Sequence, residues 1–306
     1  MMNDRISDKL KVLKPSGIRK FFDIVATKKD VISLGVGEPD FATPWNIVDA
    51  AFYNMKMGRT HYTSNFGLLE FRKEVGEYLK KYDLDYGPDE IIATIGGSEG
   101  IDLALRSIIN PGDEIIVPEP VYVPYRPLSE LTGATVVGID TSKTEFKVDA
   151  KELEKLITPK TKAIILCYPN NPTGITMPYE DLKAVAEVVK KHNIWVITDE
   201  IYSELTYVGE HTSIASFPDM KERTIYLNGF SKAFAMTGWR IGYICGPKEL
   251  IQQMVKIHQY TTLCAPIISQ YGAIEALKNS IPDMLSMRDS FARRRRLIFE
   301  GFKGLG

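Results

Sequence analysis

Lys232 lies in the stretch of the chain whose residue types are best suited to chemistry. It follows residues 224–227, a run that favours a β-strand, and Gly229 and Gly238 on either side of it favour tight turns. A lysine in a loop at the end of a buried strand can lose its proton, and the neutral amine can form a Schiff base with an aldehyde. Arg240 offers a planar fork that suits a phosphate. The stretch therefore indicates pyridoxal 5'-phosphate, although any single lysine among 38 basic residues is by default a surface residue.

A glycine-rich turn predicts an anion site. Residues 90–95 are an apolar run typical of a buried strand, and residues 96–100 contain three glycines before a helical apolar stripe that starts at residue 101. The first turn of a helix has free backbone amides at the positive end of the helix dipole, so this turn can bind a phosphate, and Ser98 can add a hydroxyl. The same pattern can also be a plain connection between a strand and a helix.

Two polar side chains follow other expected strands. Asn171 lies in a turn after residues 163–168, and Asp199 comes directly after residues 194–198. Ligands of open parallel sheets bind at the carboxyl ends of the strands. Burying a carboxylate at the end of a strand costs free energy unless the charge is paired, so Asp199 requires a partner. Glu200 is the alternative candidate for a carboxylate that pairs with a ligand at this strand end.

The order of the elements predicts an α/β fold. Strands are expected at residues 90–95, 114–117, 135–139, 163–168, 194–198, 224–227 and 243–245. Helices are expected at residues 16–22, 46–57, 68–82, 101–109, 150–157, 178–192, 247–263, 267–278 and 281–302, with a further one starting at 121–125. This alternation indicates right-handed βαβ units and a mostly parallel, mixed sheet between layers of helices.

The lysine stretch resembles the cofactor-lysine motif of the class I/II aminotransferases, which are pyridoxal-phosphate enzymes of fold type I. In that family Ser-Lys is followed by Gly-x-Arg-x-Gly, as in residues 231–232 and 238–242. The Gly-Glu-Pro-Asp-Phe segment at 37–41 and the Asn-Pro-Thr-Gly turn at 171–174 also match, and the likeness extends over nearly all of the 306 residues. It implies ping-pong transfer of an amino group from an L-amino acid of aspartate, aromatic or diaminopimelate type to a 2-keto acid. Residues 16–22 and 37–45 are similar to the N-acetyl-diaminopimelate branch.

The resemblance also implies roles for individual residues. Lys232 would bind the cofactor aldehyde and act as base and acid, Asp199 would pair with the protonated pyridine nitrogen, and Tyr202 would contact the phenolic oxygen. The implied cofactor-binding residues are Gly97, Ser98, Tyr122, Asn171, Asp199, Tyr202, Ser231, Lys232, Arg240 and, from the other subunit of a homodimer, Tyr62. The implied substrate-binding residues are Gly37, Tyr122 and Asn171. Without the resemblance, Tyr122 is more simply a core residue and Tyr62 a residue packed in a turn.

The chain departs from the family pattern in two places. Gly229 stands where the family often has a phosphate-binding serine. We therefore expect the phosphate to depend more on Arg240, Ser98, Tyr62 and backbone amides. The sequence ends at Gly306, before the C-terminal small domain that carries the family's arginine for the substrate α-carboxylate. We therefore expect an N-terminal arm and active-site loop at 1–44, a cofactor-binding large domain at 45–280, and a linking helix at 281–306 that leads to a missing small domain.

Composition gives no electrostatic argument for a nucleic-acid or membrane partner. The net charge is −1, and the four consecutive arginines at 293–296 would point in different directions on a helix. No apolar run is long enough for a membrane span, and the first 14 residues do not look like a signal peptide. Three unevenly spaced cysteines favour free thiols in the cytoplasm over disulfides or a metal site.

Two other functions fit the same cofactor residues. A carbon–sulfur lyase on this fold would share them and differ only in the reaction that follows removal of the Cα proton. A regulatory module that binds the cofactor without turnover usually carries a DNA-binding domain, and the sequence shows none.

Overall fold

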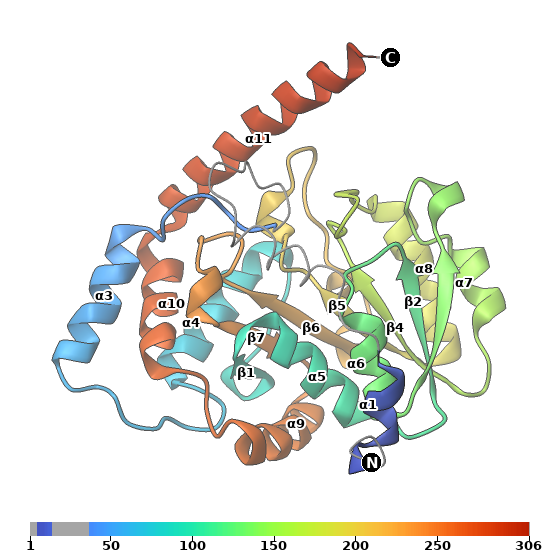
Figure 1. Ribbon diagram of the computed structural model, residues 1–306, viewed down its shortest axis with the longest axis horizontal. Coiled ribbons are helices and arrows are strands. Elements are labelled where there is room, and N and C mark those ends of the chain that lie inside the picture. The colour runs from blue at the N-terminus through green and yellow to red at the C-terminus, as the bar shows by residue number, and fades with distance from the viewer. Residues whose placement is uncertain (1–4, 14–36, 306) are drawn as a thin grey trace.

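The computed structural model describes residues 5–13 and 37–305, so the helix expected at 16–22 lies outside the described residues. The described part is built around one seven-stranded sheet with helices on both faces (Figure 1). Its strands are β1 (Ile91–Thr94), β2 (Glu114–Glu119), β3 (Thr135–Asp140), β4 (Thr161–Cys167), β5 (Trp195–Asp199), β6 (Thr224–Gly229) and β7 (Gly242–Cys245).

The sheet is mixed and mostly parallel, as the sequence predicts. Its strand order is β1-β7-β6-β5-β4-β2-β3. All neighbouring pairs from β6 to β3 are parallel, whereas β7 is antiparallel to β6 and to β1. The carboxyl ends of β4, β5 and β6 therefore lie at one edge of the sheet, and the amino end of β7 lies at the same edge.

Apart from α1, which is not expected from the sequence, the described helices agree with the expected ones except at two starting points. They are α1 (Asp8–Val12), α3 (Trp45–Lys56), α4 (Leu69–Leu79), α5 (Gly96–Ile108), α6 (Tyr125–Thr132), α7 (Ala150–Leu156), α8 (Tyr179–His192), α9 (Lys248–Thr261), α10 (Ile267–Asn279) and α11 (Ile281–Lys303). Helix α5 starts at Gly96 and not at residue 101, because the Glu99 carboxylate accepts a hydrogen bond from the Ile95 amide and closes a first turn that includes the glycines. Helix α6 begins only after Pro124, since the residue before a proline disfavours the helical conformation.

Alternate strand residues bury their side chains in layers on opposite faces of the sheet. On β4, Ile165 and Cys167 join a cluster with α5, α6 and α9, whereas Ile164 and Leu166 join one with α7 and α8. A third cluster packs α3, α4 and α10 beside β1, β6 and β7. The central strands are buried on both faces, so their ends are held rigidly in place.

Helix α11 follows α10 and extends beyond the body of the molecule (Figure 1). Residues 293–303 on it are exposed. None of the helices that the structure describes is long and apolar enough to cross a membrane.

Candidate active site

Apart from Tyr62, the residues predicted to bind the cofactor lie near the carboxyl edge of the sheet. In the strand register Cys167 is beside Asp199, and Asp199 is beside Leu227. Asn171 therefore follows the end of β4, Asp199 ends β5, and Lys232 follows the end of β6. This edge is where ligands of parallel sheets bind.

Close backbone contacts bring Arg240 to the amino end of helix α5. A Cβ atom built on Gly242 would lie 2.9 Å from the Gly96 carbonyl carbon and 3.1 Å from the Gly97 nitrogen, so β7 packs directly on the first turn of α5. A Cβ on Gly96 would lie only 2.5 Å from Nη2 of Arg240. The guanidinium thus lies against a helix amino end, where Ser98 is exposed. A cation beside free helix amides is a well-formed anion site.

The same packing explains why residue 229 is a glycine. A Cβ on Gly229 would lie 3.1 Å from both the Gly242 Cα and the Ile241 carbonyl oxygen. Neither neighbour is the flexible end of a side chain, so a serine cannot fit without moving the backbone of β7. The close approach of β6 and β7 therefore disfavours the hydroxyl that the family often places here.

Lys232 lies half-buried in the lysine loop, residues 230–241, which joins β6 to β7. Its Nζ donates a hydrogen bond to the Gly37 carbonyl at 2.5 Å, and Ser231 beside it is buried. Burial lowers the pKa of the Lys232 amine; the Glu38 carboxylate opposes this and the Arg240 charge adds to it. A lowered pKa makes the neutral amine more accessible than in an exposed lysine, which suits nucleophilic and base chemistry.

Asp199 is a buried carboxylate without a positively charged partner among the residues that the structure describes. Its side chain is 5% exposed; Oδ2 accepts a hydrogen bond from the Tyr125 hydroxyl at 2.7 Å, and Oδ1 accepts one from the Ile201 amide at 3.2 Å. Burial raises the pKa of Asp199 despite these two donors. A carboxylate in this state is well suited to a ligand that brings a protonated nitrogen.

Tyr125 is a site residue that the sequence analysis missed. It is fully buried on α6, and its ring lies 5.5 Å from that of Tyr122 in an edge-on arrangement. A buried tyrosine needs a partner for its hydroxyl, but the sequence does not show that the partner is a residue on β5. The contact depends on α6 crossing the sheet above Asp199.

Asn171, which follows β4, and Tyr202, which follows β5, form a polar pair. The Asn171 side-chain amide donates a hydrogen bond to the Tyr202 hydroxyl at 3.2 Å. Burial raises the pKa of Tyr202, so the hydroxyl stays protonated and remains a donor at neutral pH. An amide and a hydroxyl that converge in this way can bind an oxygen of a ligand.

Comparison with known proteins identifies the family. The family model for aminotransferase class I and II matches residues 29–306. The Bacillus subtilis protein named "Putative aminotransferase YugH" is 49% identical over 308 residues, which cover 100% of this chain and 80% of that protein. A "Probable N-acetyl-LL-diaminopimelate aminotransferase" of the same organism is 44% identical, with 100% of this chain and 78% of that protein covered. The aspartate aminotransferase of Thermus thermophilus solved with maleate superposes with a TM-score of 0.94 at 37% identity, covering 98% of this chain and 81% of that one.

The chain belongs to the class I and II aminotransferases. It is a pyridoxal-phosphate-dependent aminotransferase of fold type I, and the α/β fold predicted from its sequence is confirmed. The residues of this aminotransferase fit the cofactor: an anion site at α5, a lysine with a lowered pKa, and a buried carboxylate without a cation each match one part of it.

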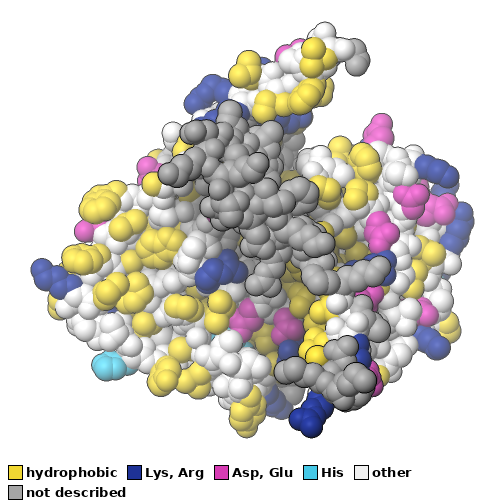
Figure 2. Space-filling view, viewed as in Figure 1, with side chains coloured by type: hydrophobic (Ala, Val, Ile, Leu, Met, Phe, Trp, Pro, Cys, Tyr) yellow, Lys and Arg dark blue, Asp and Glu magenta, His cyan; other side chains and the backbone are white. Residues whose placement is uncertain are grey.

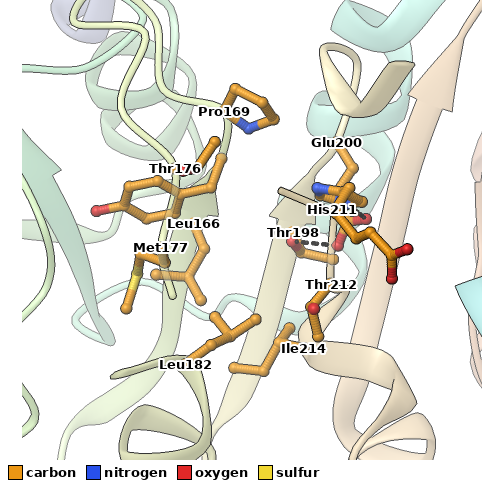
Figure 3. Close-up of a pocket in the computed structure, with 12 residues that line it drawn as sticks. Leu166, Pro169, Thr176, Met177, Leu182, Thr198, Glu200, His211, Thr212 and Ile214 are labelled. Carbon is orange, nitrogen blue, oxygen red and sulfur yellow. Dashed lines mark hydrogen bonds and ion pairs between the residues drawn. The ribbon is translucent and has the colours of Figure 1, made fainter. Parts of the chain in front are cut away.

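Glu200, the alternative carboxylate, takes part in a different network on the other face of β5. It is 2% exposed and accepts hydrogen bonds from the Thr198 hydroxyl at 3.0 Å and the Ser213 hydroxyl at 2.6 Å, and His211 Nε2 lies 2.6 Å away. Figure 3 shows Thr198, Glu200 and His211 beside a cavity of about 20 Å³, which is room for one water molecule. Neighbouring strand residues point to opposite faces, so Glu200 does not point to the Asp199 side. The network fastens the segment after β5, which carries Tyr202.

Of the other two predicted site residues, Gly37 lies at the reactive lysine and Tyr62 lies away from the cofactor-binding residues. The Gly37 carbonyl contacts Lys232 directly. Tyr62 lies in the loop between α3 and α4 with its side chain 84% exposed, and no hydrogen bond joins it to another described residue of the aminotransferase site.

Proposed function

We propose that Lys232 is the residue to which the cofactor aldehyde attaches and that its amine moves the substrate proton. When bound, pyridoxal phosphate withdraws electrons from the bond between the substrate Cα and its hydrogen. The Lys232 Nζ would take this proton from Cα as a base and, as an acid, would return one to the C4' carbon of the cofactor in the same half-reaction. The convergence of Lys232, Asp199 and Arg240 at one edge of the sheet is the observation that carries this proposal.

Arg240 and the first turn of α5 are proposed to hold the phosphate. The guanidinium supplies charge, the Gly97 amide and the Ser98 hydroxyl supply donors, and the buried Ser231 flanks the lysine. Supporting evidence is the close approach of Arg240 to Gly96, which leaves no room for a side chain between them.

The ring of the cofactor is assigned to four side chains. Asp199 would hold the protonated nitrogen, Asn171 and Tyr202 would donate to the phenolic oxygen, and the Tyr122 ring would stack on the pyridine. The hydrogen bond from Tyr125 supports the first assignment, because it orients the carboxylate and favours its ionised form.

The substrates are proposed to be a 2-keto acid and an L-amino acid of aspartate, aromatic or diaminopimelate type. The names of the relatives support this range, since they include aspartate, aromatic and N-acetyl-diaminopimelate aminotransferases. The Gly37 amide, next to the carbonyl that faces Lys232, would face the substrate α-carboxylate, and Asn171 and Tyr122 would line the same pocket.

A homodimer with shared active sites is also proposed, with Tyr62 serving the cofactor phosphate of the other subunit. Exposed apolar side chains on α3 support a second copy as the occupant of this face: Trp45 is 76% exposed, Phe52 62% and Tyr53 53%. Hydrophobic side chains are exposed over α3 in Figure 2. A monomer at micromolar concentration in sedimentation analysis would contradict the dimer.

We also propose a division of the chain into three parts and a cytoplasmic location. We assign residues 1–44 to an arm and active-site loop, 45–280 to the cofactor-binding domain and 281–306 to a linking helix. The single sheet and its three hydrophobic clusters support the second of these. Free Cys167, Cys245 and Cys264 support a reducing compartment, the cytoplasm.

Amino transfer is tested by incubating the protein with pyridoxal phosphate, one amino acid of each type and 2-oxoglutarate, and measuring the keto acid formed. We expect formation to require the acceptor and to be lost in Lys232→Ala. Lys248→Ala, at an exposed lysine paired with Asp89, is the matched control and should retain activity. Release of ammonia or a thiol without an acceptor would instead identify a lyase.

A further inference from the structure

Arg294 makes a set of contacts that the cofactor site does not explain. It belongs to the run of four arginines at 293–296, all exposed on α11. Its Nη1 lies 2.7 Å from Oδ1 and 2.9 Å from Oδ2 of Asp40. Its guanidinium carbon also lies 5.0 Å from the ring centre of Phe41 and 5.8 Å from that of Phe291. The two rings pack edge-on with their centres 5.2 Å apart.

Asp40 and Phe41 belong to segment 37–44, which contacts the lysine loop at several points. The Glu38 carboxylate accepts a hydrogen bond from the Thr237 hydroxyl at 3.1 Å. The Thr43 hydroxyl donates to the Ala235 carbonyl at 2.7 Å and accepts from the Trp239 indole at 3.0 Å. Segment 37–44 is therefore held on one side by the lysine loop and on the other by α11.

This arrangement fixes the position of Gly37 at the reacting amine. Gly37 is three residues before Asp40, so the two are joined by at most about 10–11 Å of extended chain. The hydrogen bond between the Gly37 carbonyl and Lys232 Nζ is 2.5 Å long, and a hydrogen bond weakens steeply when its geometry is disturbed. A shift of Asp40 away from α11 therefore moves the backbone that lies over Lys232.

We propose that Arg294 is a positioning residue that holds segment 37–44 over Lys232 by clasping Asp40 and Phe41 to helix α11. It touches neither the phosphate site nor the ring site, and it acts only through this segment. The inference uses the proposed role of Lys232, and it gives one of the four arginines a function that the others do not share. In Figure 1 the segment before α3 passes next to α11, in agreement with these contacts.

The first test needs no cofactor and measures hydrogen exchange of the peptide that spans residues 38–44. Arg294→Gln should raise its exchange about fivefold, which corresponds to the loss of a well-formed exposed ion pair and its ring contacts. Arg293→Gln is the matched control, because it removes the same charge one residue away and Arg293 makes no ion pair with any residue that the structure describes. Equal exchange in the two variants would overturn the proposal.

Swapping the charges of Asp40 and Arg294 distinguishes their direct contact from a general effect of losing a positive charge. Asp40→Arg alone should release the segment as Arg294→Gln does. Combining it with Arg294→Asp restores an opposite pair and should return most of the protection. A double variant that exchanges as fast as the single ones would contradict a direct interaction between the two positions.

The second test asks whether the contact of Arg294 with Asp40 and Phe41 contributes to amino transfer. In the holoenzyme Arg294→Gln should raise the KM for the amino acid about fivefold, because the segment borders the substrate side of Lys232, with kcat changed less than twofold. The Kd for pyridoxal phosphate should equal that of Arg293→Gln. A fall in kcat with an unchanged KM would overturn the positioning role, whereas absence of transfer in the parent protein would refute the proposed function and leave the exchange test valid.

Discussion

Replacing Arg240 with glutamine gives a test of the phosphate site whose magnitude follows from the structure. The guanidinium lies against Gly96, so its loss removes the cation from the amino end of α5, while the amides of Gly97 and Ser98 remain. A hydrogen bond to a charged group contributes about 1.5–3 kcal/mol, and Arg240 is exposed, so the lower end of this range applies. We expect the Kd for pyridoxal phosphate to rise about tenfold, at about 1.4 kcal/mol for each factor of ten.

The assay is an absorbance titration of the cofactor-free protein with pyridoxal phosphate and, separately, with pyridoxal, which lacks the phosphate. The second ligand is a control for Lys232, because the Arg240 charge also lowers the pKa of that amine, and this effect acts on both ligands. Arg240→Gln should reduce the preference for pyridoxal phosphate over pyridoxal about tenfold. The preference of Arg240→Lys for pyridoxal phosphate over pyridoxal should lie between those of the parent and Arg240→Gln, since lysine keeps the charge but not the planar guanidinium.

Two results would refute this reasoning. If Arg240→Gln weakens both ligands by the same factor, the arginine does not act on the phosphate. If it weakens neither, the anion site at α5 is not the site of the phosphate.

Three further substitutions test other parts of the site. Asp199→Asn should raise the melting temperature of the cofactor-free protein at pH 7. Burial raises the pKa of Asp199 in the folded protein above 3.8, so the parent protein loses stability as the pH rises and the buried carboxylate ionises. The difference in melting temperature between the variant and the parent should therefore vanish as the pH falls toward 3.8. The same variant should bind pyridoxal phosphate more weakly, and a cofactor-free protein that is less stable at pH 7 would contradict the cost assigned to the carboxylate. Tyr125→Phe removes a donor to Asp199 and should weaken cofactor binding about tenfold in the same titration, and an unchanged Kd would show that the hydrogen bond does not support the ring site. Gly242→Ala places a Cβ 2.9 Å from the Gly96 carbonyl carbon and should lower the free energy of unfolding by about 1–3 kcal/mol in urea, so a wild-type midpoint would show that α5 can move away from β7.

The sequence predicts the parts of the fold and site that depend on local patterns. The apolar runs of β4, β5 and β6 and the polar residues that follow them place Asn171 and Asp199 at one edge, because a parallel sheet aligns the carboxyl ends of its strands. The lysine is found from its turn and from the family motif around it. These features need only a few adjacent residues to be recognised.

Contacts between distant residues could not be read from the same patterns. Tyr125 reaches Asp199 across 74 positions of the chain, and Arg294 reaches Asp40 across 254. The sequence shows a tyrosine one turn beyond Tyr122 and a run of arginines, but the partners are set by how helices cross the sheet. Gly229 shows the same limit, since its departure from the family serine is explained only by the position of β7.

The account depends most directly on where the cofactor aldehyde attaches. Reducing the mixture of protein and pyridoxal phosphate with borohydride and mapping the peptides by mass spectrometry locates the modified amine. The account predicts a phosphopyridoxyl group on Lys232 and none in the Lys232→Ala variant, which should also lack the visible absorption band of the bound cofactor. Modification of a different lysine in the parent protein, or a band that persists in Lys232→Ala, would contradict it.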